Sequence, residues 1–405
     1  MEKSRTPSFT VPAFAVLLAA VTMGVAAVPA MAHSGRHGSW GNGHHGSWGD
    51  GHHGSSPNGP ESFSSRVFAT GNAITHPTAS GPETVSQPDD ITSLDGRIYV
   101  GFQNGVGPQG QASASGNTES TIVAFNLSGR PVAEWNIAGK CDGVTADPQL
   151  HRLIATVNED ANSSVYLIDP NGAATNYQYS EPLPHNGGTD AISIYDGMVL
   201  ISASAPGTTG TQAAPQPTFP AVYKATFNPQ TRIASVTPLF DDEDAAAVAN
   251  VGTDFGQTVN LALTDPDSNE DVPDYADRFA GDFMLTSQGD EEQIFVQNAG
   301  TPWQRLSVLS LTSSVDDTAW PVGPMGTIYT TDNSDNSVYA ITGPFRRGEE
   351  FVADTPCDES SAPATCPGPG YPANFLGEVN PWTGVISPVK LSGPAPEAQG
   401  MLYLP

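Results

Sequence analysis

The sequence predicts an all-β protein built from similar small sheets, and three observations lead to this prediction. Aromatic and β-branched residues come in short runs separated by Gly, Pro, Asn and Asp, in a chain of 405 residues with 42 Gly and 36 Pro. Such runs are typical of strands joined by turns. A strand–turn–strand pattern at residues 326–341 recurs along the chain in looser variants. The chain ends on one short strand, residues 401–404, and the strands predicted near residues 66–74 have no partners of their own.

The unpaired strands at the two ends predict that the repeats close into a ring. Proteins avoid open strand edges, so we expect the N-terminal strands to complete the sheet that the C-terminal strand begins. Four-stranded repeats of about fifty residues, closed end to end, indicate a β-propeller. Residues 66–405 then accommodate six blades, or seven if the long fourth and fifth units contain another.

Residues 1–32 are expected to be a signal peptide. Lys3 and Arg5 form a basic region, residues 11–28 are apolar and rich in Ala and Val, and Ala30-Met31-Ala32 is a small-x-small cleavage site. The mature protein is therefore predicted to be secreted and extracellular, with no membrane span after cleavage. An uncleaved membrane anchor is the alternative.

Residues 33–65 are expected to be a disordered tail and linker, because Gly-rich, aliphatic-poor sequence cannot bury enough surface to fold. The tail repeats the octamer that begins His37-Gly38-Ser39-Trp40. Imidazole suits Cu, Ni and Zn, so the tail is either a metal-binding segment or a plain flexible spacer. The repeat resembles the prion octarepeat, whose units bind copper. The candidate metal ligands are His37, His44, His45, His52 and His53.

Each repeat after Arg66 is expected to open with a strand that carries an acid near its start. The predicted opening strands are Asp89–Leu94, Asp142–Ala146, Asp190–Ile194, Val259–Leu263, Asp316–Trp320 and Met401–Leu404. The unit that begins at Asp316 is expected to continue into the hairpin at 326–341. A further hairpin is predicted to turn at Asn380-Pro381-Trp382-Thr383-Gly384.

The three cysteines have different expected roles. Cys357 and Cys366 lie nine residues apart in a loop rich in Pro, Ser and Ala, and an oxidising compartment favours a disulfide between them. Cys141 is left over, either as a small buried hydrophobic residue or as a free thiol. No zinc-type spacing is present.

The hairpin at 326–341 resembles the repeats of NHL and gluconolactonase-like propellers, which run Leu-Tyr-Val-Ala-Asp-x-x-Asn-x-Arg-Val. Asp332, Asn336 and Val338 match this pattern, and Ser337 stands in place of the arginine. The other repeats match more loosely, over most of residues 89–405. The resemblance implies a propeller fold and, in the gluconolactonase-like members, one divalent ion in the channel and hydrolysis of lactones or phosphate esters.

In a propeller, the acids at the strand starts are expected to surround one mouth of the central channel. A ring of carboxylates cannot all stay ionised cheaply without a cation, and oxygen ligands in a flexible ring suit Ca²⁺. The alternative is that these acids cap the strand starts by accepting backbone N–H groups or water. The resemblance implies that Glu397 and the aspartates act as metal ligands. The predicted ring consists of Asp90, Asp142, Asp190, Asp317 and Glu397.

Other candidate functional features are predicted around this ring and elsewhere. Two long insertions, 103–119 and 204–220, and the candidate ligand-binding residue His185 are expected on the same face. The acidic run Asp265–Asp271 imitates the spacing of a calcium loop but lacks its turn glycine. It is expected to be either a calcium loop or a solvated loop, on the opposite face.

The overall composition narrows the classes of function. The formal net charge is −28, from 15 Lys+Arg against 43 Asp+Glu, and such a surface repels nucleic acid. No GxSxG, HExxH, phosphate-loop or dinucleotide motif occurs. We therefore expect a propeller that binds a small ligand or divalent cation at the channel mouth. A metal-dependent lactonase or esterase, and a surface protein whose long loops bind an extracellular protein, are the alternatives.

Overall fold

The computed structural model describes residues 62–79, 81–184, 187–204, 219–356 and 374–405. Contacts divide the chain into two units, Met1–Ser55 and Ser56–Pro405, and the described residues all belong to the second. The predictions for the signal peptide, the His-rich tail, His185, the Cys357–Cys366 pair and most of the insertion at 204–220 fall outside the described residues. No helix in the described part of the chain has both the length and the apolar character needed to cross a membrane.

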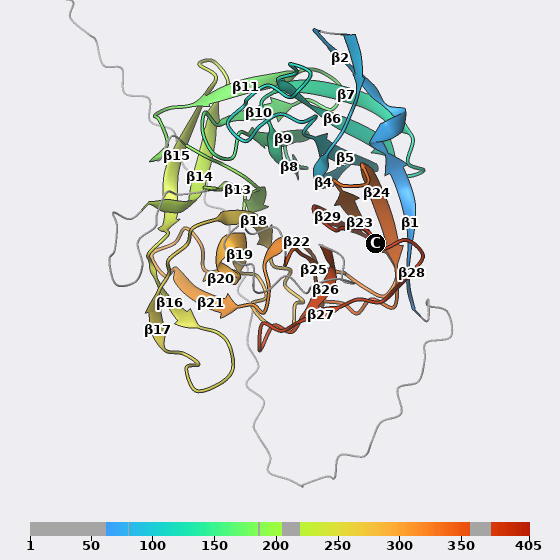
Figure 1. Ribbon diagram of the computed structural model, residues 1–405. Coiled ribbons are helices and arrows are strands. Elements are labelled where there is room, and N and C mark those ends of the chain that lie inside the picture. Colours follow the sequence, from blue (N-terminus) through green and yellow to red (C-terminus); the bar gives the residue numbers. More distant parts are fainter. Residues whose placement is uncertain (1–61, 80, 185–186, 205–218, 357–373) are drawn as a thin grey trace, which may run out of the picture. The chain divides into compact units, whose positions relative to one another are not determined.

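The second unit is a β-propeller, as the sequence predicted. Its strands form four-stranded antiparallel blades whose innermost strands surround a common centre (Figure 1). Colour runs around the ring from blue to red, and the first and last strands, β1 and β29, belong to one sheet (Figure 1). Among the described residues there are six such blades, with the inner strands β4, β8, β12, β18, β22 and β29.

The first three blades follow the chain in order, each from the inner to the outer strand. Their strands are β4 (Pro88–Leu94), β5 (Arg97–Phe102), β6 (Glu119–Asn126) and β7 (Pro131–Ala138); β8 (Cys141–Asp147), β9 (Arg152–Val157), β10 (Ser164–Ile168) and β11 (Ala174–Tyr179); and β12 (Ile192–Tyr195), β13 (Met198–Ser202), β14 (Pro220–Asn228) and β15 (Ile233–Asp241). Asp95-Gly96 and Asp196-Gly197 make the inner hairpins of the first and third blades. All four residues have positive φ, as the favoured two-residue hairpin turns require.

The fourth blade corrects one prediction. Its inner strand is not Val259–Leu263 but the acidic segment β18 (Pro266–Asp271), which pairs with β19 (Phe283–Ser287). The blade continues with β20 (Glu292–Gln297) and β21 (Arg305–Ser310), and a short 3₁₀ turn, η3 (Gln288–Asp290), joins β19 to β20. An outer hairpin of β16 (Ala245–Val248) and β17 (Thr258–Asn260) adds to β21. Asp265–Asp271 is therefore neither a calcium loop nor a solvated loop, because its backbone groups pair within the sheet.

The last two blades are interleaved, which corrects a second prediction. The inner strand β22 (Val315–Ala319) pairs with β25 (Glu350–Asp354), followed by β26 (Phe375–Val379) and β27 (Ile386–Pro388). The hairpin of β23 (Thr327–Asp332) and β24 (Ser337–Thr342) was expected beside β22. Instead, β23 pairs with β29 (Met401–Leu404) in the closing blade.

The closing blade joins the two ends of the propeller, as predicted. β1 (Phe63–Thr70) pairs antiparallel with β24, and the small edge strand β28 (Leu391–Ser392) runs parallel to β1. Phe68 on β1 packs edge-on against Tyr329 on β23, with ring centroids 4.8 Å apart. A 3₁₀ turn, η1 (Gly71–Ala73), then leads to an outlying hairpin of β2 (Thr75–Thr78) and β3 (Gly81–Thr84).

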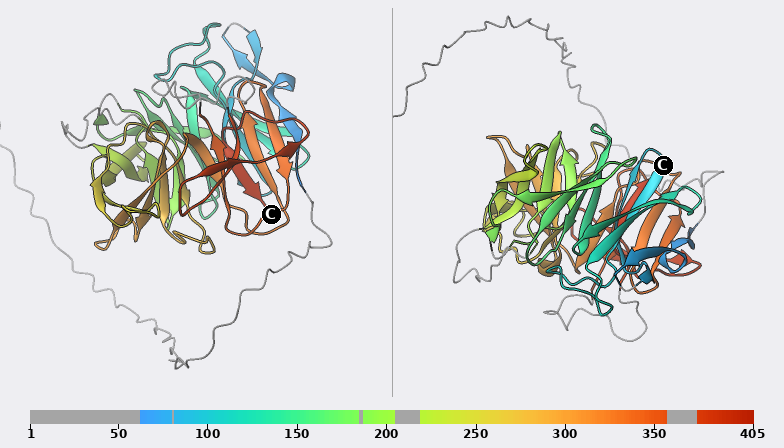
Figure 2. Two further views of the ribbon diagram at one scale, coloured as in Figure 1. Left: turned by 60° about the horizontal axis from the view of Figure 1, so that its bottom comes forward. Right: turned by 90° about the horizontal axis from the view of Figure 1, so that it is seen from above.

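The core lies between neighbouring blades rather than in one central layer. One apolar cluster joins β1, β23 and β24 to β4, β5 and β6 of the first blade, and Val100, Phe102 and Val338 are completely buried in it. Side views show that the blades stack face to face around the ring (Figure 2). Because both faces of a middle strand are covered, these strands are apolar along most of their length, as in β9.

Candidate functional site: an axial ring of aspartates

Five aspartates occupy one equivalent position at the start of five inner strands. In each inner strand, uninterrupted pairing with the adjacent strand of the same blade begins at one residue. These residues are Ile91, Val144, Ile192, Asn269, Thr318 and Met401. In four of the strands the pairing register shifts just before this residue, which marks a bulge. The residues two positions earlier are Asp89, Asp142, Asp190, Asp267, Asp316 and, in the sixth blade, Gln399.

These six positions line the same end of the central channel. A cavity of about 570 Å³ opens there, and all six residues contribute to its wall together with Lys140 and Glu159. The channel then narrows to a space of about 40 Å³, lined by the five aspartates and by Asp90 and Asp317. A third cavity, of about 320 Å³, follows toward the other end and is lined in part by Glu270.

Asp142 is the most deeply placed member of the ring. It is 5% exposed; its Oδ1 accepts a hydrogen bond from Gln103 Nε2 at 3.1 Å and forms an ion pair with Lys140 Nζ at 2.9 Å. Its Oδ2 is buried and has no hydrogen-bond partner among the described residues. A buried carboxylate oxygen without a donor is costly, so this atom points to a ligand that supplies positive charge or a proton.

Lys140 is the cation that partly offsets the ring. Its Nζ also forms an ion pair with Glu159. Burial lowers the pKa of Lys140, but Asp142 and Glu159 raise it by more, so the side chain stays protonated. One lysine does not compensate for five aspartates and Glu159.

Burial, and then the negative charge of neighbouring carboxylates, raises the pKa of every aspartate in the ring for which a shift is resolved. Burial, followed by the negative charge of Asp316, raises the pKa of Asp89 from 3.8 to about 8. Burial also raises the pKa of Asp142 and Asp190 well above 3.8, with nearby carboxylates adding to the effect. The pKa of Asp267 rises for the same reasons, and its carboxyl group is hydrogen-bonded to Asp190. Close carboxylates in a low dielectric must share protons or a cation.

Asp90 and Asp317 each follow a ring aspartate by one residue, line the narrow part of the channel and accept hydrogen bonds from the backbone. Asp90 accepts backbone N–H groups from Ile91 at 2.6 Å and from Val144 of the next blade at 2.5 Å. Both oxygens are therefore occupied by the backbone, as the strand-capping alternative predicted. The pKa of Asp90 is nevertheless raised, by burial and then by Asp317.

The predicted and observed rings overlap only in part. Of the predicted residues, Asp142 and Asp190 lie at the ring position, and Asp90 and Asp317 lie next to it. In the sixth blade the ring position is occupied by Gln399 and not, as predicted, by Glu397. The backbone N–H of Glu397 donates to Asp332 Oδ2 at 2.9 Å, and Glu397 is not among the residues that line the axial cavities.

Sequence reasoning missed Asp89, Asp267, Asp316, Gln399 and Lys140. In the doublets Asp89-Asp90 and Asp316-Asp317 the second aspartate was chosen, although the first matches the offset of Asp142 and Asp190. Counting two residues back from the first apolar strand residue identifies Asp89, because Ile91 corresponds to Val144 and Ile192. The same rule does not identify Asp267, because the residue two positions after it, Asn269, is polar.

The donor set determines what the ring can bind. All its side-chain donors are oxygens, which suit Ca²⁺ or Mg²⁺ rather than softer metals. Within the described ranges, no three His, Cys, Asp or Glu side chains already converge to metal-coordination geometry. A bound ion must therefore draw carboxylates inward or complete its shell with water.

Cys141, next to Asp142, is a structural residue. It is 1% exposed, and its Sγ approaches the Gly143 carbonyl oxygen at 3.8 Å. Burial raises the pKa of its thiol, and the surrounding aspartates raise it further. Of the two alternatives left open by the sequence, the structure supports the small buried hydrophobic residue, since the reactive thiolate is disfavoured.

Comparisons with known proteins find similar folds but no family. No family model matches the chain, and no curated protein matches it. The periplasmic gluconolactonase of Pseudomonas aeruginosa is 11% identical, over 85% of this chain and 99% of the other, with a TM-score of 0.45. A putative 6-phosphogluconolactonase from Bacteroides uniformis is 10% identical, over 80% and 91%, with a TM-score of 0.43. The β-propeller domain of Cps50 from Myceliophteria thermophila is 12% identical, over 78% and 75%, with a TM-score of 0.38. Likeness at this level carries no argument about activity.

Proposed function

We propose that this chain is a secreted β-propeller that binds a divalent cation, Ca²⁺ in the first instance, at the mouth of its central channel. The observation that carries the proposal is the uncompensated Asp142 Oδ2 within a ring of five equivalent aspartates. A divalent ion removes the mutual repulsion of the carboxylates and supplies the missing partner of this oxygen.

The ring fits Ca²⁺ better than a smaller ion. Ca²⁺ accepts six to eight oxygens in a flexible geometry, whereas Mg²⁺ requires a near-ideal octahedron. The aspartates come from different blades and are not already convergent, so a tolerant ion suits them. Water is available to complete the shell, whereas the amide oxygen of Gln399 already accepts the backbone N–H of Asn333 at 3.2 Å.

The cavity above the ring leaves room for a small molecule. At about 570 Å³ it falls in the usual range for ligand pockets. Its wall is almost entirely polar, with Gln288, Asn333 and Ser204 beside the aspartates. A polar ligand that coordinates the cation through its own oxygens fits this wall.

A second candidate function is a metal-dependent hydrolase of the lactonase or esterase type. The observation in its favour is Asp89, a carboxyl group beside an open cavity whose pKa is raised to about 8. General acids and bases work best with a pKa near the working pH. In this reading Asp89 moves the proton while the other aspartates hold the ion.

Export and the His-rich tail complete the proposal. The leader at residues 1–32 motivates an extracellular location, and the tail histidines motivate a separate site for Cu, Ni or Zn. Oxygen and imidazole ligands select different metals, so the two sites can be distinguished by metal identity.

The test is the metal content of two mature proteins, one starting at His33 and one at Ser62, purified without chelators or affinity histidines. We expect about one Ca²⁺ per chain in both forms. Asp142→Asn should lose this ion, whereas Glu181→Gln, an exposed acid outside the axial cavities, should keep it. Absence of Ca²⁺ from both forms, with no stabilisation by added Ca²⁺, contradicts the proposal. Cu, Ni or Zn in the longer form alone assigns these metals to the tail.

The hydrolase reading needs a separate assay. A panel of lactones, aryl esters and phosphotriesters is tested with and without Ca²⁺. Turnover that requires the metal and is abolished in Asp89→Asn, with Ca²⁺ still bound, supports an enzyme. Ca²⁺ binding without turnover across the panel supports a binding protein.

A further inference from the structure

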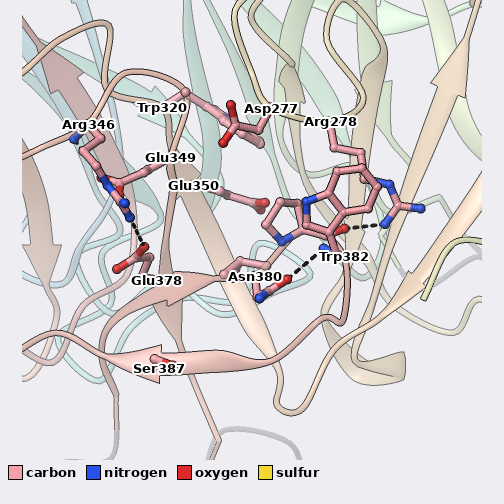
Figure 3. Close-up of a pocket in the computed structure, with 13 residues that line it drawn as sticks. Asp277, Arg278, Trp320, Arg346, Glu349, Glu350, Glu378, Asn380, Trp382 and Ser387 are labelled. Carbon is pink, nitrogen blue, oxygen red and sulfur yellow. Dashed lines mark hydrogen bonds and ion pairs between the residues drawn. The ribbon is translucent and has the colours of Figure 1, made fainter. Parts of the chain in front are cut away.

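A separate cavity, outside the channel, lies at the opposite face of the propeller from the aspartate ring. Its volume is about 300 Å³. Its walls come from the loop after β18, the end of β22, the start of β25 and the turn between β26 and β27. These segments all lie at the ends of the blades away from the channel mouth, because β18 and β22 begin at the mouth and run away from it. Figure 3 shows the lining side chains.

Two buried polar atoms in this wall have no hydrogen-bond partner among the described residues. Glu350 is 1% exposed; its Oε1 accepts from Gln293 Nε2 at 2.5 Å, and its Oε2 has no hydrogen-bond partner in the described part of the chain. Trp320 is 8% exposed, and its indole Nε1 is likewise without a partner among the described residues. One is an acceptor and the other is a donor, and each is costly to bury unsatisfied.

The facing wall is a fixed aromatic platform. Trp382 is 48% exposed and stands on the turn between β26 and β27. Arg278 donates from Nη1 to the Pro381 carbonyl oxygen and from Nη2 to that of Ala249, each at 2.6 Å, and its guanidinium lies 4.7 Å from the Trp382 ring. In Figure 3, Glu350 points toward the side on which Trp382 and Arg278 lie.

Further contacts fix the conformation of the turn between β26 and β27. Gly384 has φ +72°, and a Cβ there would collide with the Ser310 carbonyl oxygen of the neighbouring blade. Asn380 Oδ1 accepts the backbone N–H of Trp382 at 3.0 Å. The indole is thus presented by a preorganised turn, which reduces the entropy lost when a ligand binds.

We propose that this cavity binds a neutral polyhydroxylated ligand, that is, a sugar or a sugar unit of a glycan. Hydroxyl groups can both donate, as Glu350 Oε2 requires, and accept, as Trp320 Nε1 requires. The apolar C–H face of a sugar ring can lie against the exposed part of the Trp382 indole. Asp277 and Asn380 offer further hydrogen-bonding groups at the rim.

The alternative occupant, an organic cation, fits less well. Carboxylates and a tryptophan attract cations, but Arg278 already lies over the indole and repels them. A cation with no lone pair also leaves Trp320 Nε1 unsatisfied. Two of the carboxylates are already occupied, since Glu349 and Glu378 pair with Arg346.

The test uses the mature chain in EDTA, so that the axial ring is kept free of metal. Saturation-transfer NMR and calorimetric titration are run with methyl glycosides of glucose, galactose, mannose and N-acetylglucosamine, and with tetramethylammonium. Trp382→Ala removes the platform, and Trp320→Phe removes the indole N–H together with part of the ring volume. Trp303→Ala is the matched control, because Trp303 is 76% exposed and lies outside the cavity.

We expect saturable binding of at least one glycoside, weakened by about tenfold or more in Trp382→Ala and in Trp320→Phe and unchanged in Trp303→Ala. Urea unfolding of the free Trp320→Phe protein measures the cost of the lost ring volume in the core. Loss of glycoside binding in a variant that still unfolds cooperatively, with Trp303→Ala unaffected, separates a binding role from a structural one. The proposal is overturned if no glycoside binds, if both cavity variants bind like the parent, or if only tetramethylammonium saturates the site.

Discussion

Asp90 and Asp317 make the same pair of contacts in two different blades. Each accepts the N–H of the residue that follows it, Ile91 at 2.6 Å or Thr318 at 2.7 Å. Each also accepts, at 2.5 Å, the N–H of the first paired residue in the next blade along the ring, Val144 for Asp90 and Met401 for Asp317. These two carboxylates therefore link adjacent inner strands across the channel wall. The ring position beside them, at Asp89 and Asp316, lines the axial cavities instead.

Replacing Asp90 by Ala is expected to destabilise the fold by about 1–3 kcal/mol, because the buried N–H of Val144 loses its acceptor. Urea unfolding at constant pH measures the change. Asp317→Ala should behave in the same way, and Glu181→Ala, at an exposed position, should change stability little. Equal stability of Asp90→Ala and the parent would show that the link between the inner strands contributes nothing.

Replacing Asp267 by Asn should have opposite effects with and without Ca²⁺. In EDTA the substitution removes a carboxylate whose pKa is raised by burial and then by Asp190 and Asp316, so the apo protein should gain stability. In saturating Ca²⁺ the parent gains stability by mass action, and the variant should gain less. Thermal unfolding in both buffers gives the comparison. The prediction is contradicted if the variant is less stable than the parent in EDTA and gains as much stability from Ca²⁺ as the parent does. In that case the ring is not a set of mutually repelling carboxylates that binds the ion.

The metal-free protein should be more stable at pH 5 than at pH 8. Burial raises the pKa of Asp317 from 3.8 to about 7, and burial together with Asp316 raises that of Asp89 from 3.8 to about 8. Between about pH 4 and 8 the folded state therefore binds more protons than the unfolded state, and stability falls as the pH rises. Urea unfolding at several pH values in EDTA measures this slope. Ca²⁺ should flatten it, and a slope of the opposite sign would refute the assignment of repelling carboxylates.

A disulfide across the closing blade should stabilise the propeller. Ser64 on β1 is paired with Thr342 on β24, and their side-chain oxygens are 3.1 Å apart. Ser64→Cys with Thr342→Cys closes a loop of most of the chain, and we expect a gain of about 2–4 kcal/mol that is lost on reduction. Non-reducing electrophoresis confirms the bond, and the single variant Ser64→Cys is the control. Failure of the two cysteines to join under oxidising conditions would argue against the pairing of β1 with β24.

The sequence alone determined that the chain is all-β, that it is repetitive and that its two ends share a sheet. Turn residues such as Asp95-Gly96 and the short apolar runs between them are local signals, and each acts over a few residues. The closure could be inferred because a lone strand such as Met401–Leu404 needs a partner.

Only the tertiary structure decided which strands pair and which acids face the channel. The hairpin 327–342 joins β29 and β1 rather than β22, and the acidic segment 266–271 becomes an inner strand because β19 satisfies its backbone. Neighbouring side chains in a strand point to opposite sides, and a bulge shifts this alternation by one residue. Whether Asp89 or Asp90 belongs to the ring therefore depends on pairing with β5, and the sixth place of the ring, at Gln399, depends on pairing with β23. Such pairings between distant strands are fixed by packing of the whole ring and leave little trace in the local sequence.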